Sequence, residues 1–233
     1  MTHDPGSPDH DHEHGHDHDH EGGHEHAHPP QQDHDAGAMS PYEMLEEAVR
    51  TLLVEKGVLT ADEIGAQIDL MDSRTPALGA KVIAKAWTDP DFKKQLVKDT
   101  GAALAGIGID IGTLAEFRTI ENTAKIHNIV VCTLCSCYPK MLLGIPPAWY
   151  KSLAYRSRVV SDPRGVLEEF GVRINPGVEV RVHDSTADLR YLVLPMRPKG
   201  TTGLDEAALA ALVTRDAMIG TAVPVGPKVK AAK

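Results

Sequence analysis

The first 39 residues of the chain lack the side chains that build a hydrophobic core. Between His3 and Met39 there is no Val, Ile, Leu, Phe, Tyr or Trp, and histidines alternate with Asp and Glu. Such a segment cannot bury enough apolar surface to offset the entropy that it loses on ordering. We therefore predict that residues 1–39 form a disordered tail and that the fold begins near residue 40. Residues 226–233 are predicted to be a second, short flexible tail.

The His-rich tail holds eleven of the thirteen histidines of the chain within its first 40 residues. Alternating imidazoles and carboxylates are typical of weak, overlapping sites for divalent ions such as Ni²⁺, Co²⁺ or Zn²⁺. The alternative is a solvated tail with no role in metal binding.

The net charge of −9 also belongs to this tail. The first 40 residues contain ten Asp or Glu and no Lys or Arg, which leaves 23 acidic against 24 basic residues in the rest of the chain. A neutral body gives no basic surface for nucleic acid. No run approaches the roughly 18 apolar residues of a membrane span, and the N-terminus lacks the pattern of a signal peptide. We predict a cytoplasmic protein that binds neither nucleic acid nor membrane.

Residues 40–106 are predicted to form a helical N-terminal part. Ser40 with Glu43 and Thr60 with Glu63 are capping-box pairs that begin two amphipathic helices. Two further helices are expected, one over residues 77–87 and one from Asp89 onward.

Residues 107–225 are predicted to form an α/β (α+β) domain that carries the functional site. Short strands are expected over residues 117–120 and 129–132, and a capped helix over residues 162–171. The alternating segments 178–182 and 189–193 are separated by the polar run HDSTAD, which predicts a hairpin. A final helix is expected over residues 204–218.

All three cysteines of the chain, Cys132, Cys135 and Cys137, lie in the short run CTLCSC. Disulfides at this spacing would close loops too small to stabilise a fold, and an odd number leaves one thiol over. Structural zinc and iron–sulfur sites both need a fourth ligand. A redox CxxC pair would leave Cys137 unexplained. In a tight turn, however, the three sulfurs and the peptide nitrogens of Ser136 and Cys137 can reach one metal ion.

CTLCSC resembles the metal-binding motif of the nitrile hydratase α-subunit family, which also includes the metal-bearing subunit of thiocyanate hydrolase. The segments GIPPAWYKSLAYRSRVV, DPRGVLEEFG and VHDSTADLRYLVLPMRP resemble the same family. The resemblance implies a helical N-terminal arm followed by a layered α-β-β-α catalytic domain. It also implies a β-type partner subunit, with a separate third subunit as a variant, whose arginines contact the metal loop.

The same resemblance implies roles for the residues of the motif. Cys132 corresponds to the axial thiolate, Cys135 and Cys137 to the equatorial sulfurs, and the amides of Ser136 and Cys137 to nitrogen donors. Cys135 is expected as sulfinic acid and Cys137 as sulfenic acid. Thr133 is typical of cobalt-type members, which implies one low-spin Co(III) per chain, with Fe(III) as the lesser alternative.

The expected function is hydration of a nitrile to an amide at this centre. The metal would act as a Lewis acid and oxidised Cys137 as nucleophile or base, while Ser136 would orient the loop. One alternative is hydrolysis of thiocyanate to carbonyl sulfide and ammonia. An alternative of another class is a cobalt-handling or storage protein without turnover.

Five residues outside the motif were weighed for a role near it. Lys140 stands where many nitrile hydratases have tryptophan, and we expect it to shape a pocket for a polar or anionic substrate; the alternative is a solvent-facing lysine. His127 and His183 are expected to be structural. Arg156 and Arg158 are expected to be helix-surface or interface charges; the alternative is a contact that supports the metal ligands.

Overall fold

The computed structural model describes residues 39–135 and 137–227, and it is a mixed helix and strand fold. The predicted disordered tail lies outside the described residues except for Met39. The predicted flexible end lies outside them except for Gly226 and Pro227. No helix in the described part of the chain is long and apolar enough to cross a membrane.

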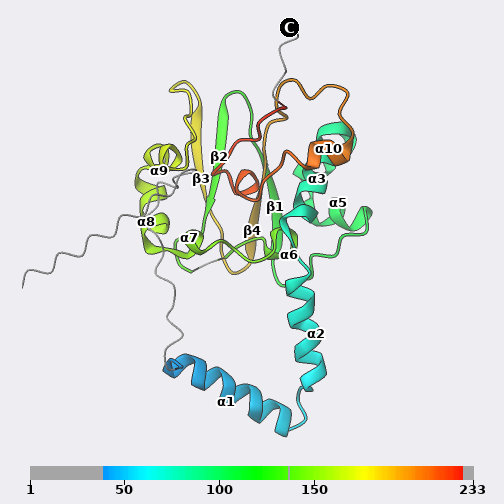
Figure 1. Ribbon diagram of the computed structural model, residues 1–233, viewed down its shortest axis with the longest axis vertical. Coiled ribbons are helices and arrows are strands. Elements are labelled where there is room, and N and C mark those ends of the chain that lie inside the picture. The colour runs from blue at the N-terminus through cyan, green and yellow to red at the C-terminus, as the bar shows by residue number, and fades with distance from the viewer. Residues whose placement is uncertain (1–38, 136, 228–233) are drawn as a thin grey trace, which may run out of the picture.

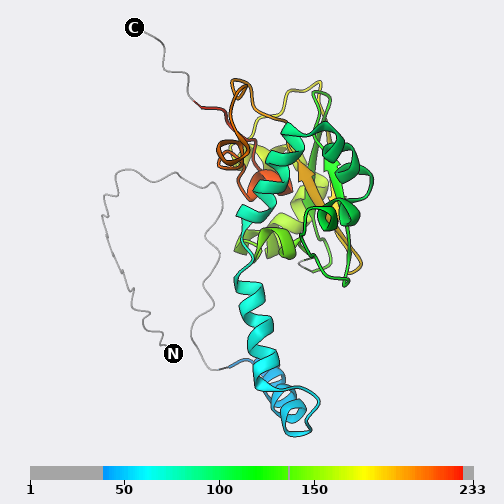
Figure 2. The ribbon, with the colours of Figure 1, turned by 90° about the vertical axis from the view of Figure 1, so that its right-hand side faces the viewer.

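Two helices form an arm that projects from the body, as predicted. Helix α1 (Pro41–Glu55) and helix α2 (Ala61–Asp72) extend away from the strands in both views (Figures 1 and 2). Each begins with the expected capping box, at Ser40 with Glu43 and at Thr60 with Glu63. Neither helix has a buried residue, so the arm presents its apolar stripes to its surroundings.

Three helices connect the arm to the strands. Helix α3 (Pro76–Thr88) buries Val82 and Ile83 in the core, and helix α4 (Pro90–Lys98) follows after Asp89 caps its first turn. Helix α5 (Thr100–Gly106) is a separate element, because the Asp99 side chain accepts a hydrogen bond from Ala102 N and begins a new helix. Both α4 and α5 pack on the first strand.

The strands form two parallel pairs. Strand β1 (Glu116–Glu121) pairs with β4 (Leu189–Leu194), and β2 (Ile126–Val131) pairs with β3 (Glu179–Asp184). The predicted hairpin between β3 and β4 is therefore wrong. The polar run between them passes from one strand pair to the other, and each strand pairs with a partner distant in sequence.

Helices cover the strand pairs from opposite sides and give the expected α-β-β-α layering (Figure 1). Helices α7 (Ala148–Lys151), α8 (Leu153–Ser161) and α9 (Pro163–Glu169) lie on the side of β3, whereas α3, α4 and α5 lie on the side of β1. Helix α6 (Lys140–Leu143) contacts α3. The core between the layers includes Ile129, Val130, Leu192 and Val193, all at 0% exposure.

The predicted final helix over residues 204–218 is also wrong. The segment contains helix α10 (Glu206–Ala210), two tight turns and the short 3₁₀ helix η1 (Asp216–Ile219). Thr214 accepts a hydrogen bond from Ala217 N and begins η1 anew, and Met218 and Ile219 become fully buried against β2 and β4. Burial of these side chains outweighs continuation of the helix.

Candidate metal centre

The cysteine loop, residues 132–137, begins directly after strand β2. In the parallel β2–β3 pair, Val131 is in register with Asp184, so the carboxyl ends of both strands meet at one edge. The Ser185 amide donates a hydrogen bond to Val131 O at 2.7 Å and extends this pairing by one residue. The loop therefore leaves the sheet at the kind of edge where α/β proteins commonly place ligands.

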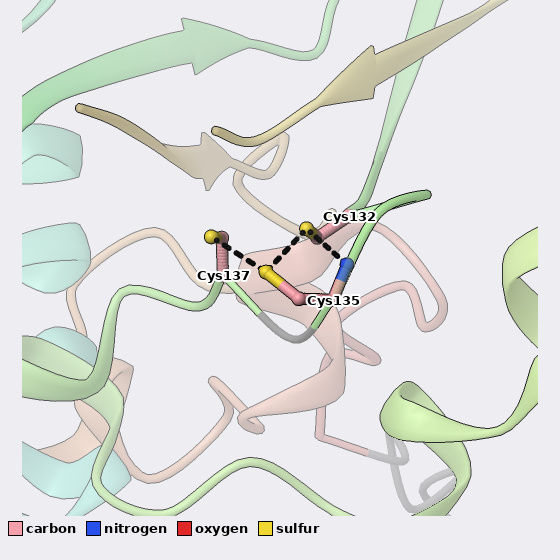
Figure 3. Close-up of side chains that lie close together, drawn as sticks. All are labelled: Cys132, Cys135 and Cys137. Atoms are coloured by element: carbon pink, nitrogen blue, oxygen red, sulfur yellow. Dashed lines mark hydrogen bonds between the residues drawn. The ribbon is translucent and has the colours of Figure 1, made fainter. Parts of the chain in front are cut away.

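The three cysteine side chains point toward one another (Figure 3). The sulfurs of Cys132 and Cys135 are 3.4 Å apart, and those of Cys135 and Cys137 are 3.2 Å apart. The Cys135 amide also faces the Cys132 sulfur at 3.2 Å. Cys132 and Cys137 are buried whereas Cys135 is exposed, so the cluster is supported from below and open on one side.

These distances fit three sulfurs on one transition metal. For a metal–sulfur bond of about 2.3 Å, two sulfurs lie about 3.3 Å apart at a right angle and about 3.8 Å apart at the tetrahedral angle. The observed 3.4 and 3.2 Å match the right-angled arrangement. Among the described residues, no histidine or carboxylate joins the three cysteines. The side chains thus suit a square-planar or octahedral ion better than tetrahedral zinc.

The electrostatics around Cys137 favour its neutral thiol until a cation binds. Burial, with hydrogen bonds from Cys135 and Cys132, raises the pKa of Cys137 to about 12, and the charge of Arg190 opposes this rise. Metals bind the thiolate form of cysteine. Binding of a metal cation to the loop must therefore release protons.

A carboxylate from strand β3 holds the start of the loop. Asp184 accepts hydrogen bonds from Thr133 N at 2.9 Å and from the Thr133 hydroxyl at 2.5 Å. Both bonds come from the residue next to Cys132, so they fix the direction in which the chain leaves β2.

Three side chains from α7 and α8 hold carbonyl oxygens at and beside the loop. The Tyr155 hydroxyl donates to Val130 O at 2.7 Å, and the Tyr150 hydroxyl donates to Cys137 O at 2.9 Å. The Arg156 guanidinium donates to Cys135 O at 3.1 Å. Tyr150 and Tyr155 belong to a group of edge-packed aromatic rings with Tyr138, Trp149 and Phe170. These packed rings give the loop a rigid base.

The other predicted residues are placed as follows. Ser136 lies outside the described residues. Lys140 is exposed as the first residue of α6, three positions after Cys137. Arg158 forms an ion pair with Glu169. Arg156 contacts the loop, which agrees with the alternative expected for it and not with a surface role alone.

His127 and His183 are both held by hydrogen bonds within the fold. His127 donates from Nε2 to Gly220 O at 2.8 Å, and His183 Nε2 lies 2.8 Å from Asn128 Oδ1. Burial lowers the pKa of both rings, and for His183 the charge of Arg181 adds to this effect. This agrees with the prediction that both are structural.

Sequence reasoning missed Asp184, Tyr150 and Arg190 as neighbours of the cysteines. They come from β3, α7 and β4, between 13 and 53 positions away from the loop residue that each approaches. One signal in the sequence could have identified them as residues near the site. Asp184 and Tyr150 lie in two segments that carry the family resemblance, VHDSTADLRYLVLPMRP and GIPPAWYKSLAYRSRVV.

Comparisons with known proteins agree with this arrangement. The family model described as "Nitrile hydratase, alpha chain" matches residues 40–222. The low-molecular weight cobalt-containing nitrile hydratase subunit alpha of Rhodococcus rhodochrous is 50% identical over 181 residues, covering 77% of this chain and 87% of that protein. Thiocyanate hydrolase subunit gamma of Thiobacillus thioparus is 42% identical over 197 residues, covering 80% and 81%.

The fold is similar as well. A solved structure of an iron-type nitrile hydratase variant from Comamonas testosteroni Ni1 superposes with a TM-score of 0.73 at 41% identity, covering 81% of this chain and 94% of that one. Sequence, fold and the position of the cysteine loop all lead to the same assignment. The chain belongs to the nitrile hydratase alpha-chain family.

Proposed function

We propose that this chain is the metal-bearing α subunit of a cobalt-type nitrile hydratase, which converts a nitrile to the corresponding amide. The observation that carries the proposal is the convergence of Cys132, Cys135 and Cys137, with the Cys135 sulfur at right-angled spacing from the other two. The relative from Rhodococcus rhodochrous, named as cobalt-containing, supports the choice of metal. When bound, low-spin Co(III) supplies a Lewis acid that polarises the nitrile.

The residues of the cysteine loop have different roles in this proposal. The three sulfurs hold the metal, and the peptide nitrogens of Ser136 and Cys137 complete the donor set. Cys135 is carried as sulfinic acid and Cys137 as sulfenic acid. The oxidised Cys137 acts as the nucleophile or as the base that activates water. Ser136 orients the loop. Asp184, Tyr150 and Arg156 keep the donors in place through the hydrogen bonds described above.

A partner subunit completes the site. Both named relatives are subunits of larger enzymes. Within the cysteine loop, Leu134 is 89% exposed, and an apolar side chain beside a metal site suits coverage by another chain. We propose a β-type partner, as one or two separate chains, that contributes arginines to the oxidised cysteines. We place the assembled enzyme in the cytoplasm.

Thiocyanate is the second candidate substrate, because of Lys140. Its ammonium group stands on the exposed first turn of α6, close in sequence to Cys137. A cation near the open side of the site would attract an anionic substrate. The 42% identical relative named thiocyanate hydrolase subunit gamma supports the same idea.

The test uses the full chain co-expressed with its partner subunit. Metal analysis should find one cobalt per chain, and intact mass should show added oxygen on the peptide that contains Cys132 to Cys137. Amide formation from nitriles is then compared with ammonia release from thiocyanate. Amide formation supports the first proposal and ammonia release the second. Bound cobalt without either product would instead indicate a cobalt-handling protein, and zinc in fully reduced cysteines would refute the metal assignment.

Lys140→Trp separates the two substrates. If Lys140 attracts anions, this variant should lose activity on thiocyanate or anionic nitriles relative to neutral nitriles. Lys125→Trp, a change of the same type just before β2, serves as the control. An unchanged substrate profile in Lys140→Trp would remove Lys140 from the substrate pocket.

A further inference from the structure

Arg156 is a charged side chain that donates a hydrogen bond to a carbonyl oxygen within the cysteine loop. Its Nη1 donates to Cys135 O at 3.1 Å across 21 positions of sequence. The other side chain that holds a loop carbonyl is Tyr150, a neutral hydroxyl whose pKa is raised, chiefly by burial. The contact of Arg156 therefore differs from that of Tyr150 in bringing a full positive charge.

The carbonyl oxygen that Arg156 binds has a special chemical relation to the metal centre. Cys135 O and the Ser136 nitrogen belong to the same peptide group, and resonance connects the electrons of these two atoms. A peptide nitrogen that binds a metal has given up its hydrogen, so the group carries a negative charge. Part of that charge resides on Cys135 O, where a charged donor is about twice as effective as a neutral one.

The environment of Arg156 suits it to stabilise negative charge on Cys135 O. Its Nε atom is buried and has no hydrogen-bond partner among the residues that the structure describes. Its charge is not cancelled by a carboxylate in the described ion pairs, whereas Arg158, on the same helix, pairs with Glu169. The uncompensated positive charge of Arg156 is thus available to the loop.

We propose that Arg156 is a positioning residue of the metal centre: it stabilises the negative charge that the Cys135–Ser136 peptide group acquires when its nitrogen holds the metal. The inference rests on the proposed function, because it assumes a metal with peptide-nitrogen donors. It assigns to this chain's own helix α8 a share of the charge compensation that the family resemblance gave to the partner's arginines alone.

The test compares metal retention in the cobalt-loaded complex of the full chain and its partner. The variants are Arg156→Gln and, as the matched control on the same helix, Arg158→Gln. Three quantities are measured: cobalt per chain, the rate of cobalt loss to a chelator, and the energy of the sulfur-to-cobalt absorption band. Arg156→Gln is expected to lose cobalt roughly 10- to 100-fold faster, the usual effect of removing a residue that supports metal ligands. Its absorption band should shift, and Arg158→Gln should match the wild type.

Arg156→Lys is the second variant, in case loss of the charge prevents folding. Lysine keeps the charge but not the planar guanidinium, so cobalt should stay bound while the absorption band shifts. Added methylguanidinium should slow cobalt loss from Arg156→Ala, and added urea, which is similar in shape but neutral, should not. A merely structural role for Arg156 would not give this difference.

The possible results distinguish a failure of the proposed Arg156 role from a failure of the proposed function. If the wild type loads cobalt, and Arg156→Gln or Arg156→Lys keeps both the wild-type rate of loss and the wild-type absorption band, the role of Arg156 is refuted while the proposed function stands. If the wild type binds no cobalt, both the proposed function and this inference are refuted.

Discussion

Asp184→Asn tests whether strand β3 holds the start of the cysteine loop in place. In the wild type, one carboxylate accepts two hydrogen bonds from Thr133, at 2.9 and 2.5 Å. Asparagine keeps the size, and its oxygen still accepts from Thr133 N while its NH₂ group donates to the Thr133 hydroxyl, so the substitution replaces a charged acceptor by neutral partners. Hydrogen bonds to a charged group contribute about 1.5–3 kcal/mol, against about 0.5–1.5 kcal/mol for neutral pairs.

Solvent reduces the size of this effect, because Thr133 and Asp184 are both exposed. Discounting for screening, we expect a loss of about 1–2 kcal/mol in total. Such a change corresponds to roughly a 5- to 30-fold change in an equilibrium. Since the weakened bonds orient the residue next to Cys132, the cost should be seen in metal binding more than in global stability.

The assay is the rate of cobalt loss to a chelator from the assembled complex, together with the thermal unfolding temperature. Asp184→Asn should lose cobalt about 5- to 30-fold faster than the wild type, in line with that estimate. Asp188→Asn is the control, because it removes the same charge from an exposed position in the same connection. If both variants retain cobalt equally, the Thr133–Asp184 contact does not organise the loop.

Two further predictions concern the contacts of strand β2 with Gly220. Gly220 has φ 88°, and a Cβ there would overlap Asn128 O, whereas Gly200 has φ 77° with open space around it. Gly220→Ala should therefore lower the unfolding temperature by at least about 5 °C more than the control Gly200→Ala. Equal losses in the two variants would show that steric overlap is unimportant. Burial lowers the pKa of His127 from its ordinary value of 6.5, so the unfolded chain binds its proton more readily than the folded chain. The contribution of His127 is complete above pH 6.5 and declines as the pH falls below it. The loss of unfolding free energy between about pH 7.5 and 5.5 should be smaller in His127→Gln, and an unchanged loss would assign it to other groups.

Helix starts could be predicted because their signals are local. Ser40 with Glu43 and Thr60 with Glu63 satisfy the first free amides of α1 and α2 within the same turn. No contact elsewhere in the fold is needed for these bonds. The capped helix α9 was predicted for the same reason, since Asp162 accepts a hydrogen bond from Gly165 N three positions on.

Strand pairing could not be predicted in the same way. Alternation of apolar and polar residues shows which face of a strand is buried, but it does not show which strand lies beside it. The segments at β3 and β4 lie close in sequence and resemble a hairpin, yet each pairs in parallel with β2 or β1. The final helix failed for a related reason: burial of Met218 and Ile219 at 0% exposure depends on β2 and β4.

The sequence by itself determined that three cysteine sulfurs lie close together at one candidate metal site. Cys132, Cys135 and Cys137 are separated by so few residues that covalent geometry alone keeps their sulfurs near one another, in any fold that allows a turn. Their number and spacing already disfavoured disulfides, zinc and iron–sulfur clusters, and the surrounding segments indicated the family.

Only the tertiary structure decided what holds those donors. Asp184 reaches Thr133 because β2 and β3 are parallel and in register at Val131, and Arg156 reaches Cys135 O because α8 packs beside the same edge. These contacts join residues 51 and 21 positions apart. No local pattern encodes them, since they arise from the packing of whole layers, and that packing brings a carboxylate and a guanidinium into contact with one short loop.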